Sequence, residues 1–143
     1  MQENNTKIKH NNFIISGLTG TGKTILLDKI VEDNMSNYSI VIIEEENIDK
    51  ILNDLDTNNL EKTFLIIDDS ITTLSNAKLE TVEKLLNIME DKDNNVKVGL
   101  TIHNAKHLNL IKNNIFCNRI EKMNFVNFKT MKNNNIHSVD MVA

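Results

Sequence analysis

The chain has 143 residues, of which 40% are hydrophobic and 25% are charged, and its formal net charge is −4 at pH 7. This length and composition indicate one folded domain with a buried core, and the net acidity excludes an overall basic surface for nucleic acid. We therefore expect a single domain over residues 1–143, with a short polar lead over residues 1–11 and a polar tail over residues 129–143. Cys117 is the only cysteine, which excludes an internal disulfide.

The sequence also argues against a membrane protein. No apolar run approaches the roughly 20 residues that a transmembrane helix needs. The start, MQENNTKIKH, lacks the apolar centre of a secretory signal. We expect a cytoplasmic protein without a membrane partner.

The first predicted strand covers residues 13–16 and runs into a glycine-rich loop. Residues 17–24 are GLTGTGKT, which matches the pattern G-x-x-x-x-G-K-[ST] at every fixed position. From Lys23 onward, apolar residues recur at helical spacing, which predicts a helix. These residues are Leu26, Leu27, Ile30 and Val31. The pattern therefore lies between a strand and a helix, the context that a phosphate-binding loop requires.

This loop predicts a binding site for ATP and Mg²⁺. Glycines let backbone amides lie close to a phosphate, and the positive end of the helix faces the same anion. Lys23 is predicted to neutralise the β- and γ-phosphates as a catalytic residue, and the Thr24 hydroxyl to bind Mg²⁺. The predicted nucleotide-binding residues are Gly17, Leu18, Thr19, Gly20, Thr21, Gly22, Lys23 and Thr24.

A second buried strand is predicted over residues 39–44, followed by an amphipathic helix. The apolar stripe of that helix consists of Ile48, Ile51, Leu52 and Leu55, and Asn47 is the expected cap. Glu44, Glu45 and Glu46 lie at the start of this helix, where the helix dipole favours acidic side chains. We interpret them as a solvated cluster outside the site.

The third predicted strand, residues 63–70, ends in the acidic pair Asp68 and Asp69. A phosphate-binding loop needs a carboxylate at the end of a nearby strand to complete its magnesium site. We assign Asp68 to the Mg²⁺ shell and Asp69 to catalysis, where it would polarise the water that attacks the γ-phosphate. The alternative is that both are solvated acids that end a strand.

The remaining elements continue the alternation of helices and strands. A helix carrying Leu79, Val82, Leu85, Leu86 and Met89 on one face is expected after Ser75 or Asn76. A fourth strand is predicted over residues 96–103, a short helix over 104–114 and a fifth strand within 115–128. The tail after Phe128 is expected to be loosely ordered. This alternation predicts an α/β fold with a parallel sheet.

The order of these elements resembles that of the additional-strand P-loop ATPases. No guanine-reading N-K-x-D element is present, and the single arginine, Arg119, disfavours a small-molecule kinase. The resemblance implies a mainly parallel five-stranded sheet between two layers of helices, with the fourth strand inserted between the first and third. The polar tip of that strand would sense the γ-phosphate. Thr101 and Asn104 are the sensor candidates, and His103 is a catalytic candidate whose alternative is a plain surface residue.

Residues 64–120 resemble the FtsK/HerA superfamily, and within it the genome-packaging ATPases of large double-stranded DNA viruses of the poxvirus and virophage types. The shared features are paired aspartates after an apolar strand, a following helix and a polar strand ending. Two positions depart from the family, since His103-Asn104 replaces a strand-end Gln and Lys112 stands where an Arg is usual. The resemblance makes Arg119 the arginine-finger candidate, with a surface or salt-bridge role as the alternative.

The resemblance also implies partners and a location. It implies a ring of five or six copies that hydrolyses ATP to translocate double-stranded DNA, with a capsid or portal protein as a further partner. The location would be the host cytoplasm or viral factory, or the virion. Two alternatives stay open: a helicase-loader or replication-associated ATPase that remodels another protein, and a nucleotide-binding module that is not a motor.

Overall fold

A six-stranded sheet forms the centre of the molecule, with strands in the order β2-β3-β4-β1-β5-β6. The computed structural model describes residues 12–17, 22–34, 38–55, 62–91, 95–123, 125–131 and 135–140. The elements are β1 (Asn12–Ser16), α1 (Lys23–Asn34), β2 (Ser39–Ile43), α2 (Ile48–Asp54), β3 (Thr63–Ile67), α3 (Ser70–Asn76), α4 (Leu79–Glu90), β4 (Val96–Ile102), the 3₁₀ helix η1 (Ala105–Leu110), α5 (Ile115–Ile120), β5 (Phe125–Met131) and β6 (Asn135–Asp140).

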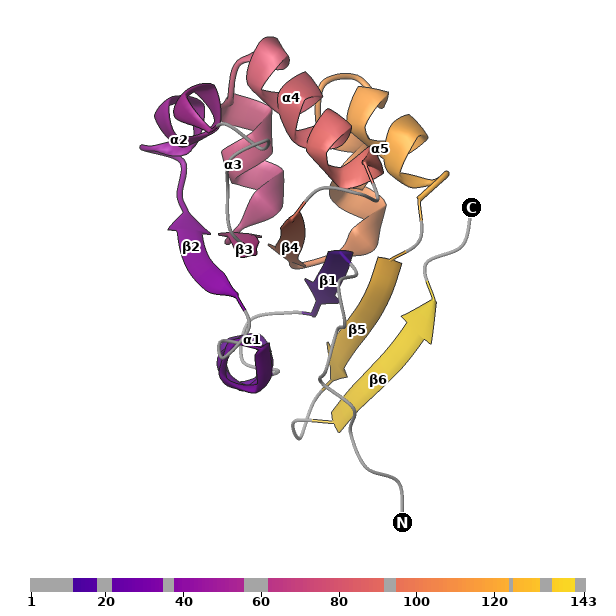
Figure 1. The fold of residues 1–143 in the computed structure, drawn as a ribbon. Helices are drawn as coiled ribbons and strands as arrows, with labels where there is room; N and C mark the ends of the chain where they lie inside the picture. The colour runs from indigo at the N-terminus through magenta and orange to yellow at the C-terminus, as the bar shows by residue number, and fades with distance from the viewer. Residues whose placement is uncertain are drawn as a thin grey trace.

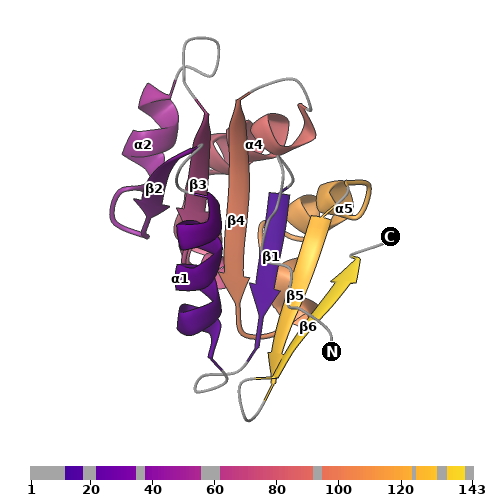
Figure 2. The same ribbon diagram turned by 60° about the horizontal axis from the view of Figure 1, so that its bottom comes forward.

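The sheet lies between two layers of helices, as predicted. Of the described helices, only α1 covers one face, while α2, α3, α4 and α5 cover the other (Figures 1 and 2). The first five strands pair in parallel, and β6 pairs antiparallel with β5. The predicted α/β/α fold with a five-stranded parallel sheet is confirmed. No helix among the described residues combines the length and the apolar character that crossing a bilayer requires.

β4 occupies the position that decides where the site forms. It lies between β1 and β3, with Ile15 beside Thr101 and Ile67 beside Leu100. The predicted insertion of the fourth strand between the first and third is therefore confirmed. Since the three strands are parallel, their carboxyl ends meet at one edge of the sheet, and polar residues that follow them come together there.

Gly99 of β4 makes room for an aromatic cluster beneath α1. A Cβ atom built on Gly99 would lie 2.2 Å from Cζ of Phe13. The Phe13 ring is fully buried and packs edge-on against Phe64, with ring centroids 5.9 Å apart, and against Phe128 at 6.5 Å. The ring therefore has no free space into which it could withdraw.

We expect the substitution Gly99→Ala to lower the free energy of unfolding by about 1–3 kcal/mol, the usual cost of overpacking a filled core. Urea unfolding followed by circular dichroism measures the effect. A Phe13→Leu background removes part of the ring, so Gly99→Ala should cost less in that background than in the native chain. Equal stability of Gly99→Ala and the native chain would contradict this account of the packing.

Several expectations about the ends of helices and strands were wrong or incomplete. The third strand ends at Ile67 rather than at residue 70, and a separate helix, α3, begins at Ser70. Hydroxyl groups hold that helix to the strand: Ser70 Oγ donates to the Ile67 carbonyl at 2.6 Å, and Thr73 Oγ1 donates to the Asp68 carbonyl at 3.0 Å. Helix α4 then starts after Lys78 instead of after Ser75 or Asn76.

The hydrogen bonding of the α2 N-cap also differs from the expectation. Asn47 does occupy the N-cap position, but its Oδ1 accepts from the Glu44 N–H at 2.9 Å and not from a helix amide.

The described parts of the C-terminal tail form strands, contrary to expectation. β5 extends to Met131, and β6 pairs with it from Val126 opposite Asp140 to Met131 opposite Asn135. The ladder is made by backbone groups, so a polar sequence does not prevent it, and polar residues suit a strand at the edge of a sheet.

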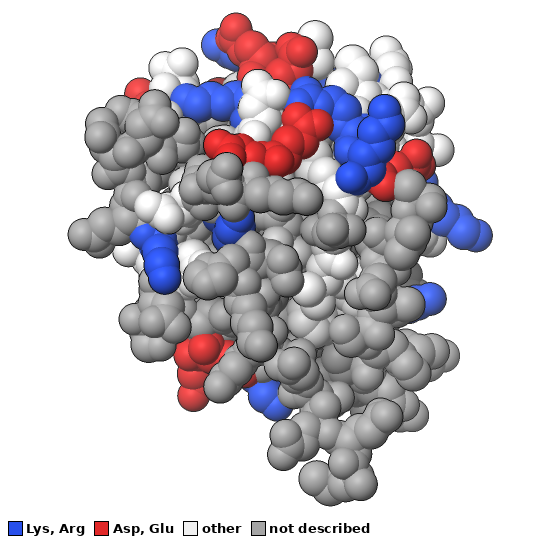
Figure 3. All heavy atoms as spheres, turned by 45° about the vertical axis from the view of Figure 1, so that its right-hand side comes forward, with Lys and Arg blue, Asp and Glu red and all other residues white. Residues whose placement is uncertain are grey.

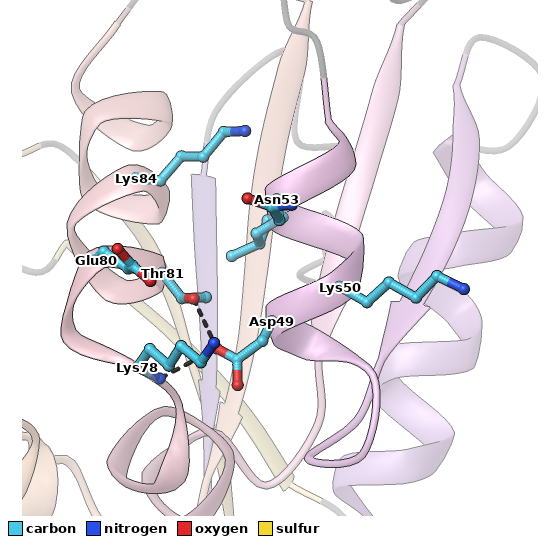
Figure 4. Close-up of a pocket in the computed structure, with 8 residues that line it drawn as sticks. Asp49, Lys50, Asn53, Lys78, Glu80, Thr81 and Lys84 are labelled. Carbon is cyan, nitrogen blue, oxygen red and sulfur yellow. Dashed lines mark hydrogen bonds between the residues drawn. The ribbon is translucent and has the colours of Figure 1, made fainter.

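A groove of about 490 Å³ separates α2 from α4 (Figure 4). Asp49 of α2 reaches the start of α4, where its Oδ1 accepts from the Lys78 N–H at 3.1 Å and from the Thr81 hydroxyl at 2.6 Å. In return, Lys84 Nζ of α4 donates to the Leu55 carbonyl at the end of α2 at 2.9 Å. Each helix thus satisfies backbone groups at an end of the other.

We expect Asp49→Ala to lower the free energy of unfolding by about 1 kcal/mol at pH 7, as the loss of a helix cap does. The hydrogen bond from Thr81, and next that from the Lys78 backbone, lower the pKa of Asp49. Because the folded-state pKa lies below the unfolded one, the stabilisation is complete above about pH 4 and is lost as the pH falls through the folded-state pKa.

Urea unfolding of the native chain and Asp49→Ala across pH 7 to pH 3 measures this dependence. The stability difference should be largest at pH 7 and shrink at the acid end. Asp54→Ala, at an exposed acid of the same helix, is the matched control and should change little. A difference that stays constant with pH would show that the carboxylate charge of Asp49 is not involved.

Candidate nucleotide-binding site

The two described ends of the predicted phosphate loop meet at the end of β4. The N–H of Gly17 donates to the Ile102 carbonyl at 3.1 Å, and Lys23 Nζ donates to the same carbonyl at 3.5 Å. The roles predicted for Leu18, Thr19, Gly20 and Thr21 fall on residues outside the described part of the chain. The loop therefore starts and ends beside β4, as a loop wrapped over the end of the sheet requires.

Gly22 sets the entry into α1. Its φ is 93°, in the left-handed region that residues with a Cβ rarely adopt, and its carbonyl accepts from the Leu26 N–H at 3.0 Å. Thr24 follows in the first turn of α1 and is exposed. Its hydroxyl is therefore accessible to a metal ion above the helix N-terminus.

The acidic pair lies in a turn that β4 holds through one hydroxyl. Thr101 Oγ1 donates to Asp68 Oδ1 at 2.5 Å and accepts from the Asp69 N–H at 3.0 Å. Thr101 is buried, with 4% of its surface exposed, whereas both aspartates are exposed. One side chain thus fixes the carboxylate of the first acid and the backbone of the second.

Asp69 has an unusual backbone conformation. Its φ of 47° and ψ of 56° place it in the left-handed region, which Asp tolerates better than most residues. Asp69 is the N-cap of α3, and its carbonyl accepts from the Thr73 N–H at 3.0 Å. The turn is thereby held from α3 as well as from β4.

Lys23 lies within electrostatic reach of both acids. Burial lowers the pKa of the Lys23 ammonium below its ordinary value, while the negative charges of Asp68 and Asp69 act in the opposite direction. The fold therefore brings together the loop lysine and the acidic pair, although 45 residues or more separate them in the sequence.

The residues of the site fit Mg²⁺. Asp68 and Thr24 offer carboxylate and hydroxyl oxygens, the hard ligands that this ion prefers. Among the described residues, no group of three or more His, Cys, Asp or Glu side chains could hold a metal ion by itself. Mg²⁺ commonly uses one or two protein oxygens and completes its shell with phosphates and water.

The other predicted residues at the tip of β4 are exposed. His103 and Asn104 follow the strand directly, and Asn104 Oδ1 accepts from the Lys106 N–H at 2.9 Å. Asn104 therefore caps η1 in this structure. The catalytic role of His103 and the sensor role of Asn104 stay predictions.

Sequence reasoning missed the contact between Thr101 and the acidic pair. It placed Thr101 only as a candidate sensor of the γ-phosphate. The sequence does contain a signal for this residue. Apart from Gly99, Thr101 is the one residue of the run Val98–Ile102 that is not apolar. Finding its partner required the strand order.

Arg119 is held by α4 in this chain. Its guanidinium forms an ion pair with Glu90 and donates from an Nη to Asn87 Oδ1 at 2.8 Å. Glu90 ends α4 shortly before β4 begins, whereas Lys23 contacts the residue where β4 ends. The ion pair corresponds to the salt-bridge alternative, and the arginine-finger role stays a prediction.

The chain belongs to the family described as Novel STAND NTPase 3, which it matches over residues 2–137. It is therefore a P-loop NTPase, in agreement with the predicted class. The finer expectation of an FtsK/HerA packaging ATPase finds no support in this match. No curated protein matches the chain.

Solved structures with a similar fold include those of the following three proteins. The ORC2 protein of Aeropyrum pernix in ADPNP-ADP complexes is 14% identical with a TM-score of 0.60, over 87% of this chain and 42% of that one. AMPPCP-bound DnaA from Aquifex aeolicus is 18% identical with a TM-score of 0.54, over 87% and 42%. Cdc6p from Pyrobaculum aerophilum is 16% identical with a TM-score of 0.52, over 81% and 38%. The likeness shows the fold alone, and this chain spans less than half the length of each.

Proposed function

We propose that this member of the Novel STAND NTPase 3 family binds ATP with Mg²⁺ and hydrolyses the bond to its γ-phosphate. The observation that carries the proposal is that Lys23, which contacts Ile102 at the end of β4, interacts electrostatically with both Asp68 and Asp69. A cation facing two carboxylates suits a triphosphate and its metal ion. The choice of ATP is supported by the solved ORC2 and DnaA structures, which contain ADPNP, ADP or AMPPCP.

Each residue has a distinct task in this proposal. In the proposal, the loop between Gly17 and Thr24 binds the phosphates through its backbone, and Lys23 neutralises their β and γ charges. Thr24 and Asp68 hold Mg²⁺, which supplies further positive charge to the phosphates when bound. Asp69 accepts a hydrogen bond from the attacking water and orients it toward the γ-phosphorus.

Thr101 positions the acids, and its loss should slow hydrolysis. In Thr101→Val the shape is kept, but both hydrogen bonds to the acidic pair disappear. We expect turnover to fall by about 10- to 100-fold, as when a partner that orients a ligand group is removed, while the affinity for the nucleotide changes little. Steady-state phosphate release and nucleotide titration measure the two quantities.

The matched control for this position is Thr101→Ser, which keeps the hydroxyl. It should restore most of the turnover that Thr101→Val loses. If the Val variant hydrolyses ATP as fast as the native chain, the hydroxyl has no positioning role.

Of the larger roles considered, we favour a replication-associated ATPase over a DNA-packaging motor. The family match is to an NTPase family other than FtsK/HerA, and the similar folds are those of ORC2, Cdc6p and DnaA. On the face drawn in Figure 3, basic and acidic side chains of the described residues are interspersed.

Steady-state ATP hydrolysis tests these proposals, measured with Mg²⁺ or with EDTA and with or without double-stranded DNA. Turnover that requires Mg²⁺ supports the assigned chemistry. Strong stimulation by DNA, together with a ring of five or six copies, would instead favour translocation. Tight binding of Mg-ATP without turnover under any condition would contradict hydrolysis and leave a nucleotide-binding module.

A further inference from the structure

β2 forms an outer edge of the sheet and carries no charge. It pairs with β3 on one side, and no other described strand pairs with it (Figures 1 and 2). Its sequence is SIVII, and Ile42 is 47% exposed. Natural edge strands are usually protected by a lysine, a proline or a bulge, because an unprotected apolar edge invites another strand. None of these is present between Ser39 and Ile43.

The backbone of β2 has groups directed away from β3. The N–H of Ser39 donates to the Lys62 carbonyl at 2.8 Å, and the Ile43 carbonyl accepts from the Asp68 N–H at 3.4 Å. In a parallel strand, the residues that bond to one neighbour alternate with those that face the opposite side. The N–H and C=O groups of Ile40 and Ile42 therefore point outward, ready for a further strand.

We propose that β2 pairs with β2 of a second copy of this chain, antiparallel about a two-fold axis, so that one sheet runs through both copies. All five residues of β2 can pair with β2 of the other copy only if the two-fold axis passes beside Val41. Ser39 then lies opposite Ile43, and Ile40 opposite Ile42, with every contact made twice as two-fold symmetry requires. The outward groups of Ile40 and Ile42 complete the ladder.

The charges beside β2 favour a second copy of the chain as its partner and an antiparallel direction for the pairing. Glu44, Glu45 and Glu46 follow the end of β2, and exposed Lys62 lies beside its beginning, bonded through its carbonyl to Ser39. Antiparallel pairing brings the acidic run of each copy toward Lys62 of the other. Parallel pairing would instead bring the two acidic runs together in a chain that already carries a net charge of −4.

The dimer should depend on concentration. A ladder of five residues per copy is small beside a standard interface of about 1,600 Å². The inference does not depend on nucleotide hydrolysis, because β2 contributes none of the residues assigned to the phosphates or the metal.

Sedimentation velocity over a range of protein concentrations tests the proposal. The native chain should form dimers as its concentration rises, and Ile42→Lys should raise the dimer dissociation constant at least about tenfold by placing a charge in the ladder. Leu110→Lys is the matched control, since Leu110 is 63% exposed and lies away from β2, and it should leave the constant unchanged. A monomer at every concentration, or association that Ile42→Lys does not weaken, would overturn the proposal.

Cross-linking tests the register independently of affinity. Val41 of one copy would lie opposite Val41 of the other, as a pair that is not hydrogen-bonded. The two Cα atoms would be about 4.5 Å apart, which is within reach of a disulfide. In a Cys117→Ser background, Val41→Cys should therefore form a disulfide-linked dimer on mild oxidation, and Leu110→Cys should not. Failure of Val41→Cys to link, or equal linking of both variants, would exclude this pairing.

Discussion

Lys23→Ala is expected to lower ATP turnover by about 100- to 1,000-fold, because it removes the positively charged donor that we propose for the phosphates. In the folded chain Lys23 is half-buried, and burial lowers its pKa against the opposing effect of Asp68 and Asp69. In the proposed site, a bound triphosphate would place negative charge next to this ammonium group. Without the lysine, the two carboxylates repel the nucleotide, so we also expect weaker binding.

The measurement is steady-state phosphate release, together with titration of a fluorescent ATP analogue. Lys29→Ala is the matched control, because Lys29 lies on the same helix and is exposed. It should retain native turnover and affinity. Native turnover in Lys23→Ala would show that the loop is not the hydrolytic site.

Asp69→Asn is expected to lower turnover by about 100- to 1,000-fold while nucleotide affinity stays within about threefold of the native value. The substitution removes the charge that we propose to polarise the attacking water but keeps the size of the side chain. Asn also tolerates the left-handed conformation that Asp69 adopts with its φ of 47°, so the start of α3 should be preserved. The loss should therefore lie in the chemical step.

The neighbouring acid provides the comparison. Asp68→Asn removes the charge assigned to Mg²⁺ and should weaken Mg²⁺-dependent binding as well as turnover, whereas Asp69→Asn should not. Turnover and affinity of both variants, measured across a range of Mg²⁺ concentrations, separate the two roles. An identical response of the two variants to Mg²⁺ would contradict the division of labour between them.

Several parts of the fold and the site followed directly from the sequence because their signals are local. The buried strands β1, β3 and β4 appear as apolar runs, and the loop pattern from Gly17 to Thr24 joins a strand to a helix within a short stretch. Asp68 and Asp69 could be assigned because polar residues at the end of a buried strand mark the edge where sites form. Such features need only neighbouring residues to be recognised.

Local signals failed where weak propensities were decided by distant partners. The segment SITTLSN contains few good helix formers, yet it forms α3 because Ser70 and Thr73 bond to the end of β3. The polar tail forms β6 because β5 offers a backbone ladder to it. Propensity is a weak guide in such segments, since tertiary contacts override it.

By itself, the sequence determined the class of the protein: an α/β domain with a phosphate-binding loop and an acidic pair. The tertiary structure decided how those parts meet. The strand order placed Thr101 beside the acidic pair and left β2 at an edge of the described sheet, and the packing of α5 against α4 gave Arg119 its ion pair with Glu90. The two side-chain contacts join residues about 30 or more positions apart, and the edge position of β2 depends on the order of all the described strands. No local pattern in the sequence encodes either feature.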